Sequence, residues 1–371
     1  MVGASDPARI AAVPVETAVP LPLRALPERE LIARWDPAEG DTPWVSVCCM
    51  AYNHADTVAD AIEGMLAQRT DFPFEVLVQD DASTDDTAEV VRRYARSHPR
   101  VVTALLREEN LYRRNGKTLG NVLPHARGRW IAVCEADDYW SDPEKLALQV
   151  AALRRTGAEL SLHPAVEVDT RTGAASMVGR LAHANDLLRP GSTLRIRTPP
   201  YAAAVYARAA LDRYEQYRDR WRPPLGDVFM MAFGSAAGGV AYLDRPMSVY
   251  RRYLAGSWTV EHRTDHVGAA RHGIRMLTAL DALAEAAPDL ERDARARQRT
   301  VWNQLPRSLQ RAITAGQLTR REARRLWPRG SRAPLEAAVA RWAAITVPAS
   351  FVDRLRSALR PMLRRAGRDG R

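Results

Sequence analysis

Two adjacent carboxylates, Asp137 and Asp138, lie shortly after an apolar run, Ile131 to Cys134. Such a run with β-branched residues predicts a buried strand, so the acids should emerge at its carboxyl end, where open α/β sheets bind ligands. Like charges this close raise each other's pKa, and a divalent cation, Mg²⁺ or Mn²⁺, converts the repulsion into binding. For the pair taken alone, a solvated turn that caps the next helix is the more frequent structure.

Two earlier apolar runs also end in polar clusters. The clusters are Tyr52 with Asn53, and Asp80 with Asp81. Because parallel strands gather their carboxyl ends along one edge of a sheet, these side chains should lie near the later acidic pair. Three aligned clusters favour a site for a polar ligand, such as a nucleotide, over a set of unrelated turns.

Strands alternate with helices up to this point of the chain. The expected strands are 44–50, 74–78, 101–106 and 131–134, and the expected helices begin near 57, 87 and 119. This alternation predicts βαβ units and an α/β fold with a mainly parallel sheet flanked by helices. The polar stretch Glu108 to Lys117 predicts a surface loop. Residues 1–41, rich in Pro and Ala, predict an extension with one short helix near Glu28 to Arg34.

The composition is that of a globular protein, with 46% apolar and 26% charged residues among 371. No stretch reaches the roughly 18 apolar residues of a membrane span, and we expect a cytoplasmic protein. Cys48, Cys49 and Cys134 lie in predicted strands without metal-ligand spacing and should be buried and reduced. Residues 320–371 account for the net charge of +10, because they contain 14 arginines and four acids. The body is balanced, so no nucleic acid is expected at the acidic site.

Three segments together resemble the nucleotide-binding half of family 2 glycosyltransferases. They read V-S-V-C-C-M-A-Y-N-H, F-E-V-L-V-Q-D-D-A-S-T-D-D-T and G-R-W-I-A-V-C-E-A-D-D-Y-W-S-D-P-E-K-L, in this order, within about 43–258. The resemblance implies the Rossmann-like GT-A fold and an inverting enzyme that uses a nucleoside-diphosphate sugar and Mg²⁺ or Mn²⁺. It also implies a donor half at 42–142 and an acceptor half at 143–260, followed by a basic helical region at 261–371.

The resemblance also implies roles for individual residues on the donor side. Donor-binding residues would be Tyr52, Asn53, Asp80, Asp81, Asn121, Asp137 and Arg251. Asp81 matches the acid that contacts the base, and Asp137 and Asp138 match the family's D-x-D motif for metal and diphosphate. The first position of that motif is Glu135 here, so the metal ligands are sought at Asp137 and Asp138. A leaving diphosphate needs such cationic stabilisation.

On the acceptor side, Asp227 in P-P-L-G-D-V-F-M-M-A-F resembles the family's catalytic base. Inversion in one displacement needs one such base, although Asp227 could equally cap a helix. Arg251 could meet phosphate and Trp258 could stack on the acceptor sugar, or they are a solvated arginine and a core tryptophan. A processive synthase would carry a Q-x-x-R-W box and membrane spans, which are not found. One sugar per encounter, with UDP as the commonest donor nucleotide, is therefore expected in bacterial cell-surface glycan synthesis.

The C-terminal region has helical spacing, first at 274–283 and then at 351–363, where arginines surround the apolar positions. A basic amphipathic helix can lie on the anionic inner face of a membrane, which would suit a lipid-linked acceptor, and a glycan or small-molecule acceptor is equally open. The alternatives are a helix packed on the catalytic domain and self-association. A non-catalytic nucleotide-sugar-binding scaffold is the rival hypothesis for the whole chain.

Overall fold

The computed structural model describes residues 18–40, 42–116, 118–181, 187–196, 198–224, 226–254 and 265–328. The chain forms two compact units, one of residues 1–220 and 225–255 and one of residues 221–224 and 256–371. Trp258 and the basic segment at 351–363 lie outside the described residues.

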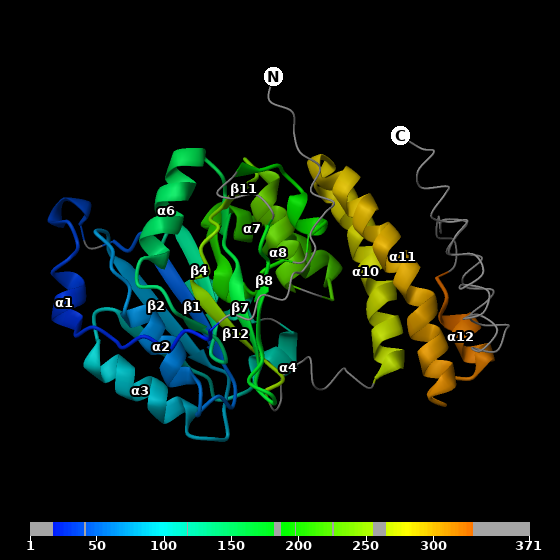
Figure 1. Cartoon of the computed structure of the whole chain (residues 1–371), viewed down its shortest axis with the longest axis horizontal. Helices are drawn as coiled ribbons and strands as arrows, with labels where there is room; N and C mark the ends of the chain where they lie inside the picture. Colours follow the sequence, from blue (N-terminus) through cyan, green and yellow to red (C-terminus); the bar gives the residue numbers. More distant parts are fainter. Residues whose placement is uncertain are drawn as a thin grey trace. The chain divides into compact units, whose positions relative to one another are not determined.

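An eight-stranded sheet forms the centre of the first unit, in the order β3-β2-β1-β4-β10-β6-β11-β9 (Figure 1). Its strands are β1 (Val45–Ala51), β2 (Phe74–Asp80), β3 (Val102–Leu106), β4 (Trp130–Glu135), β6 (Leu160–Leu162), β9 (Leu187–Leu188), β10 (Ala204–Ala207) and β11 (Val240–Tyr242). β3, β2, β1 and β4 are parallel, and β10 runs antiparallel between β4 and β6. The predicted mainly parallel α/β sheet is confirmed.

Helices flank this sheet, so every residue of β1 and β2 is buried, as expected for strands covered on both faces. The helices of the first unit are α1 (Glu28–Ile32), α2 (Val58–Leu66), α3 (Thr87–Ser97), α4 (Leu111–Asn115), α5 (Leu119–Val122), α6 (Lys145–Thr156), α7 (Arg208–Trp221) and α8 (Gly226–Ala236). Short 3₁₀ helices are η1 (Pro37–Glu39), η2 (Leu123–His125), η3 (Ser192–Leu194) and η4 (Tyr201–Ala203).

Several local predictions are confirmed. The predicted helix near Glu28 is α1, and its Leu31 is fully buried in the core around β1 and β2. Cys48, Cys49 and Cys134 are buried free thiols. The stretch predicted as a surface loop, by contrast, contains the short helix α4, because the Asn110 side chain accepts a hydrogen bond from the Arg113 N–H at 2.8 Å and caps it.

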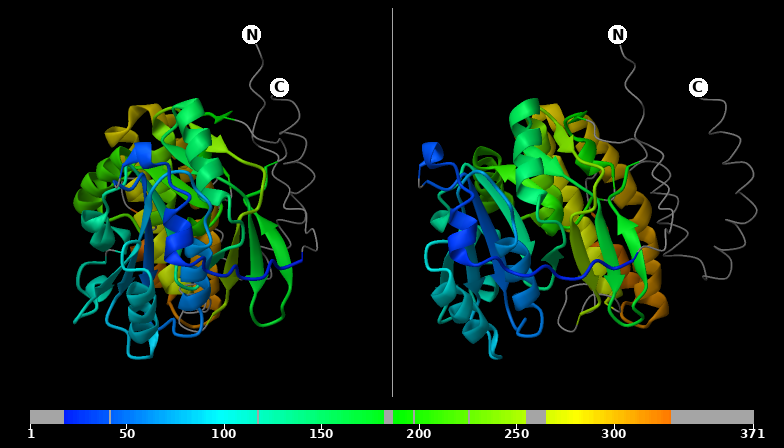
Figure 2. Two further views of the ribbon diagram at one scale, coloured as in Figure 1. Left: turned by 90° about the vertical axis from the view of Figure 1, so that its left-hand side faces the viewer. Right: turned by 60° about the vertical axis from the view of Figure 1, so that its left-hand side comes forward.

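A second sheet, which the sequence did not predict, has the order β5-β12-β7-β8. Its strands are β5 (Tyr139–Trp140), β7 (Ala165–Asp169), β8 (Ala175–Val178) and β12 (Ser248–Arg252). In Figure 2 its green hairpin, β7 with β8, lies apart from the blue and cyan strands of the main sheet. β5 directly follows the acidic pair and pairs with β12 through Val249 and Tyr139, which brings residues near 250 to the end of β4.

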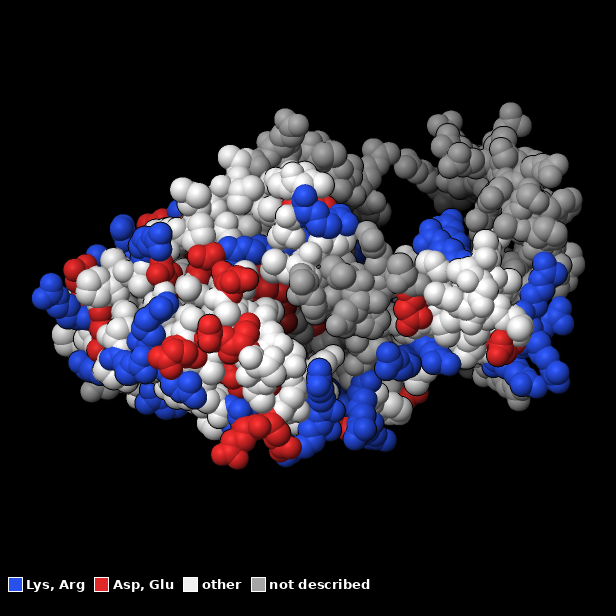
Figure 3. Space-filling view, turned by 90° about the horizontal axis from the view of Figure 1, so that it is seen from below, with Lys and Arg blue, Asp and Glu red and all other residues white. Residues whose placement is uncertain are grey.

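The second unit consists of α10 (His266–Ala286), η5 (Pro288–Leu290), α11 (Glu291–Thr314) and α12 (Arg320–Leu326) within its described part. α10 and α11 lie side by side (Figure 1) and bury Leu277, Leu280 and Leu283 of the predicted helical pattern. Exposed arginines follow along α11 and α12, namely Arg307, Arg311, Arg320, Arg321, Arg324 and Arg325. Figure 3 shows such blue side chains on the surface of this unit. None of the helices described is long and apolar enough to cross a membrane.

Lys145, at the start of α6, is a fully buried cation. Its ammonium donates to Gln149 Oε1 at 2.7 Å and lies 4.2 Å from the centre of the Trp140 ring. Burial lowers the pKa of Lys145 to about 7, with the Cys134 thiol opposing the change. In the unfolded chain, the pKa of this ammonium group is about 10.4. Between these two values unfolding takes up a proton, so the contribution of Lys145 to stability rises with pH in that window.

We therefore predict that Lys145→Met changes the pH dependence of stability. The free energy of unfolding of the wild type should rise relative to that of the variant between about pH 7 and 10, by up to about 1.4 kcal/mol per pH unit. Urea unfolding at pH 7, 8 and 9 measures this difference. Arg155→Met, at an exposed position of the same helix, is the control and should give a flat difference. A flat difference for Lys145→Met would contradict the prediction.

Candidate active site

The acid turn, defined here as Glu135 to Asp138, begins at the last residue of β4, at the carboxyl edge of the main sheet. It is closed by the Asp138 N–H, which donates to the Glu135 carbonyl at 3.1 Å. Asp138 is only 1% exposed, and its Oδ1 accepts the backbone N–H of Arg251 at 2.9 Å. Its Oδ2 is buried with no hydrogen-bond partner among the described residues. Buried oxygens normally have partners, so this one indicates room for a ligand.

Burial and mutual repulsion shift the titration of the whole acid turn. Burial raises the pKa of Glu135 to about 8, and the charges of Asp137 and Asp227 add to the effect. Burial also raises the pKa of Asp137, which His54 and Arg251 oppose. The pKa of Asp138 lies well above its usual value, first because of burial and then because of Asp137. Bound positive charge would relieve this repulsion.

Arg251 on β12 is the main cation at the acid turn. Its guanidinium donates to the Asp137 carbonyl at 3.3 Å, forms an ion pair with Asp60 of α2, and lies 4.5 Å from the centre of the Tyr139 ring. β12 pairs with β5 on one side and with β7 on the other, and these pairings fix the position of the Arg251 backbone. Arg251 thus holds the acid turn although it lies 113 positions from Asp138 in the sequence, so no local motif could have identified this contact.

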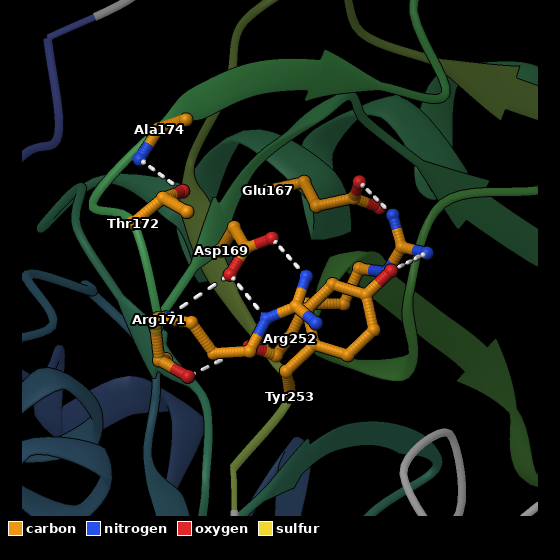
Figure 4. Close-up of polar contacts among 8 residues, drawn as sticks. Glu167, Asp169, Arg171, Thr172, Ala174, Arg252 and Tyr253 are labelled. Atoms are coloured by element: carbon orange, nitrogen blue, oxygen red, sulfur yellow. Dashed lines mark hydrogen bonds and ion pairs between the residues drawn. The ribbon is translucent and has the colours of Figure 1, made fainter. Parts of the chain in front are cut away.

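The next two residues anchor the end of β12 to the β7–β8 hairpin (Figure 4). Arg252 donates to Glu167 Oε1 at 2.8 Å and to the Tyr253 hydroxyl at 2.7 Å. The Arg171 guanidinium carbon lies 3.6 Å from the centre of the Tyr253 ring, and Arg171 also forms an ion pair with Asp169. Tyr253 has φ 68°, a conformation that costs a residue other than glycine about 1–2 kcal/mol. These contacts offset that cost and hold β12 in place.

The loops after β1 and β2 are joined by polar contacts at the same edge. Asn53 has φ 55°, which asparagine tolerates, and its Oδ1 accepts the Thr84 N–H at 2.8 Å. Its own N–H donates to Ser83 Oγ at 2.9 Å. Asp80 is buried, with Oδ2 accepting the Ser83 N–H at 3.2 Å and Oδ1 lacking a partner within the part of the chain that is described.

The Asp81 carboxylate, which the sequence assigned to the base of the donor, accepts hydrogen bonds from backbone N–H groups of α4. Its Oδ1 accepts the Leu111 N–H at 2.9 Å, and its Oδ2 accepts the Tyr112 N–H at 3.0 Å. The Asn110 side chain donates to the Asp81 carbonyl at 3.1 Å. The predicted base-binding carboxylate therefore also holds the start of α4 against the sheet edge.

Two further predicted donor residues lie around α4 and α5. The Arg113 guanidinium of α4 lies 5.7 Å from the centre of the Tyr52 ring, so α4 covers this tyrosine. Asn121 of α5 accepts a side-chain hydrogen bond from Asn115 at 2.9 Å, and its carbonyl accepts from Arg107 at 3.1 Å. Arg107 in turn donates its backbone N–H to the Asp80 carbonyl at 3.0 Å. Asn121 thus connects to the sheet edge through Arg107.

Asp227 is the second residue of α8, in its first turn, and its Oδ1 accepts the Val228 N–H at 2.8 Å. Its negative charge contributes to raising the pKa of Glu135. The chain brings together residues 135–138 and 251 from two separate segments.

His54 and Asp60 lie at this site but were not predicted. The buried Nδ1 of His54 has no hydrogen-bond partner in the described ranges, and the charge of His54 lowers the pKa of Asp137. Its position directly after Asn53 in the sequence could have identified it as a site residue. The ion pair of Asp60 with Arg251 joins residues 191 positions apart and has no local signal.

The residues present fit a metal ion that is shared with a substrate. No group of three His, Cys, Asp or Glu side chains among the described residues could hold a metal alone. Mg²⁺, however, is commonly bound through one or two carboxylates together with substrate phosphates. The half-buried Asp137 and the unpartnered Oδ2 of Asp138 match that arrangement.

Comparison with known proteins finds a family model and several relatives that match this chain. The model of the family "Glycosyl transferase family 2" matches residues 46–214. The uncharacterized protein Rv1520 of Mycobacterium tuberculosis is 32% identical over 264 residues, which are 70% of this chain and 73% of that protein. The succinoglycan biosynthesis protein ExoO of Rhizobium meliloti is 29% identical over 260 residues, covering 67% and 73% of the two chains.

A shorter match is found with WfaP of Escherichia coli, named as a UDP-Glc:alpha-D-GlcNAc-diphosphoundecaprenol beta-1,3-glucosyltransferase. It is 35% identical over 97 residues, which are 26% of this chain and 36% of that protein. The matched sequence, the mainly parallel sheet and the acid turn at its carboxyl edge agree with one another. This chain belongs to glycosyltransferase family 2.

Proposed function

We propose that the protein transfers one sugar from UDP-hexose to a hydroxyl group of a glycan or lipid-linked acceptor, with inversion at the anomeric carbon. The observation that carries the proposal is the acid turn at the carboxyl edge of the main sheet, where the buried Asp138 Oδ2 has no hydrogen-bond partner among the described residues and could bind a metal diphosphate. The name of WfaP supports UDP as the nucleotide and a diphospholipid as the acceptor. ExoO supports a role in bacterial glycan synthesis.

On the donor side, the nucleoside would bind at the ends of β1 and β2. Tyr52 offers a ring, Asn53 and Asp80 lie at the strand ends, and Asp81 would accept from the base with the lone pairs that Leu111 and Tyr112 leave. Asn121 and Arg107 would border this site next to Asp80. The contacts between the two loops hold these groups in place before a ligand binds, which lowers the entropic cost of binding.

Asp137 and Asp138 would hold Mg²⁺ or Mn²⁺ at the diphosphate. When bound, the ion would neutralise negative charge that develops on the leaving UDP. Arg251 would keep the acid turn in place and add positive charge near Asp137, because its backbone N–H donates to Asp138 and its guanidinium donates to the Asp137 carbonyl. Trp258 lies outside the described residues, and its stacking on the acceptor sugar is a proposal from the sequence.

Asp227 would act as the base. The acceptor oxygen would form its bond to the anomeric carbon from the face opposite UDP while the bond to the diphosphate oxygen breaks. The acceptor proton would pass to the Asp227 carboxylate, and the electron pair of the broken bond would leave with UDP. One displacement with one base gives inversion.

The second unit offers a surface for a lipid-linked acceptor. The exposed arginines of α11 and α12 provide positive charge that would suit anionic lipid headgroups at the inner face of the membrane. This contact would be peripheral, and it would place the protein in the cytoplasm with access to diphospholipids.

We predict that UDP raises the melting temperature more than dTDP or GDP, and that Mn²⁺ or Mg²⁺ strengthens the effect. At about 100 times Kd, binding should stabilise by about 2.7 kcal/mol, or roughly 5 to 10 °C. A thermal-shift series with and without EDTA measures this. Asp137→Asn should lose the metal-dependent part, whereas Asp86→Ala, an exposed acid at the same edge without a side-chain cap, should keep it. A folded wild type that no nucleotide stabilises would exclude the donor site.

We predict that Asp227→Asn lowers kcat for sugar transfer by about 10² to 10⁴-fold while UDP still binds, because the amide cannot take the proton. UDP release from UDP-Glc, with diphospholipid-linked GlcNAc analogues as acceptors, is the assay. Asp212→Asn, an exposed acid on α7, is the control and should behave as the wild type. Transfer by Asp227→Asn at the wild-type rate would rule out this base. UDP binding without transfer by the wild type would favour the non-catalytic scaffold.

A further inference from the structure

The segment ahead of α1, residues 18–27, is called the N-terminal strap below. Figure 2 shows it in dark blue, running from α1 toward the green strands of the second sheet. At that end the Pro20 carbonyl accepts a hydrogen bond from the Tyr139 hydroxyl at 2.6 Å. Closer to α1, the Leu26 N–H donates to the Leu66 carbonyl at the end of α2, at 3.1 Å. The strap is therefore tied both to a helix of the main sheet and to a strand of the second sheet.

The ring of the same tyrosine lies against the Arg251 guanidinium. Tyr139 belongs to β5 and is 3% exposed. The centre of its ring lies 4.5 Å from the guanidinium carbon. An aromatic ring attracts a guanidinium that stacks on it and limits the number of orientations open to that side chain. Because the hydroxyl of this ring is bonded to Pro20, the strap holds the ring against which Arg251 lies.

Helix α2 supplies an anion for the same guanidinium. Gly64 of α2 packs against the backbone of β5, since a Cβ atom there would lie 2.7 Å from the Trp140 carbonyl oxygen. Any larger residue would push the helix away from the strand. Asp60 lies one turn before Gly64, on the same face of α2. Its side chain is 32% exposed and forms the ion pair with Arg251, whose side chain is 16% exposed. The close packing of α2 on β5 thus brings Asp60 within reach of β12.

We propose that Asp60 and Tyr139 are positioning residues for the donor site, because they hold the Arg251 guanidinium on the acid turn. The N-terminal strap supports this arrangement through its bond to Tyr139. The inference rests on the proposed donor site. The guanidinium donates to the Asp137 carbonyl at 3.3 Å, so its orientation acts directly on the turn. A side chain that is already ordered loses little conformational entropy when a metal diphosphate binds beside it.

Charge alone predicts the opposite effect of Asp60 on the donor. Asp60 is a carboxylate beside a site for an anionic ligand, so its neutralisation would remove repulsion and leave the charge of Arg251 to attract phosphate. Positioning predicts that the same change weakens binding, because the guanidinium loses its fixed place on the acid turn. The sign of the change in affinity therefore separates the two roles.

The first test uses the protein without ligands. Melting temperatures are measured for Asp60→Asn, Tyr139→Leu and Arg251→Met, and for both double variants with Arg251→Met. Residues in contact give non-additive effects, so each double variant should lose less than the sum of its single variants. Tyr94 of α3, whose hydroxyl donates to Glu63 at 2.7 Å, is the control. The losses of Tyr94→Leu should add to those of Arg251→Met. Additive losses for Asp60→Asn or Tyr139→Leu would overturn the positioning role of that residue.

The second test measures ligand binding. Titration calorimetry gives the Kd of UDP at saturating Mn²⁺ for each folded variant. Asp60→Asn and Tyr139→Leu should each weaken binding by about tenfold, as the loss of a residue that supports metal ligands usually does. Asp60→Glu keeps the carboxylate and should restore most of the affinity. Asp71→Asn changes an exposed acid after α2 and should bind as the wild type does.

The outcomes of this titration are distinct. Unchanged or tighter binding by Asp60→Asn would overturn its positioning role even if the melting temperatures couple. Tyr139→Phe keeps the ring and loses only the bond to Pro20, so it should weaken binding less than Tyr139→Leu does. Wild-type affinity of Tyr139→Phe would overturn the role of the strap, and Tyr94→Phe is its matched control. A folded wild type that binds no UDP would instead overturn the donor site, and this inference with it.

Discussion

Repulsion between carboxylates at the end of β4 is the constraint on which this structure depends. Glu135, Asp137 and Asp138 follow one another in a buried turn, and Asp227 adds its charge from α8. An uncompensated cluster of this kind would open the turn or stay protonated. The Arg251 backbone and guanidinium provide the compensation that the protein itself supplies. Among the described residues, the Asp138 Oδ2 still has no hydrogen-bond partner.

The second sheet has its place in the fold because Arg251 must reach the acid turn. β5 is only two residues long, yet it pairs with β12 directly beside Asp138. β12 is held on its other side by β7, and the Tyr253 ring between arginines anchors its end. A change in the position of the β7–β8 hairpin would therefore move β12. Through Arg251, it would also affect the acid turn.

The sequence predicted those parts of the molecule whose signals are local. Apolar runs followed by Asn53, Asp80 and Asp137 indicated strands that end in polar groups, and the helix expected to begin near residue 87 is α3. Antiparallel β10, inserted between β4 and β6, and the pairing of Arg251 with Asp60 depend on contacts between distant residues.

Asp81 has a proposed role in binding the nucleotide and an observed role in holding α4. Its carboxylate accepts two backbone N–H groups of α4, so residue 81 shapes the segment that covers Tyr52. An asparagine at this position would keep one acceptor oxygen and turn an NH₂ group toward a backbone donor. Substitutions at residue 81 would therefore alter α4 together with the proposed contact to the base. In evolutionary terms, this position can vary only along sequences that still cap the helix, which makes it less free to change than its exposed neighbours.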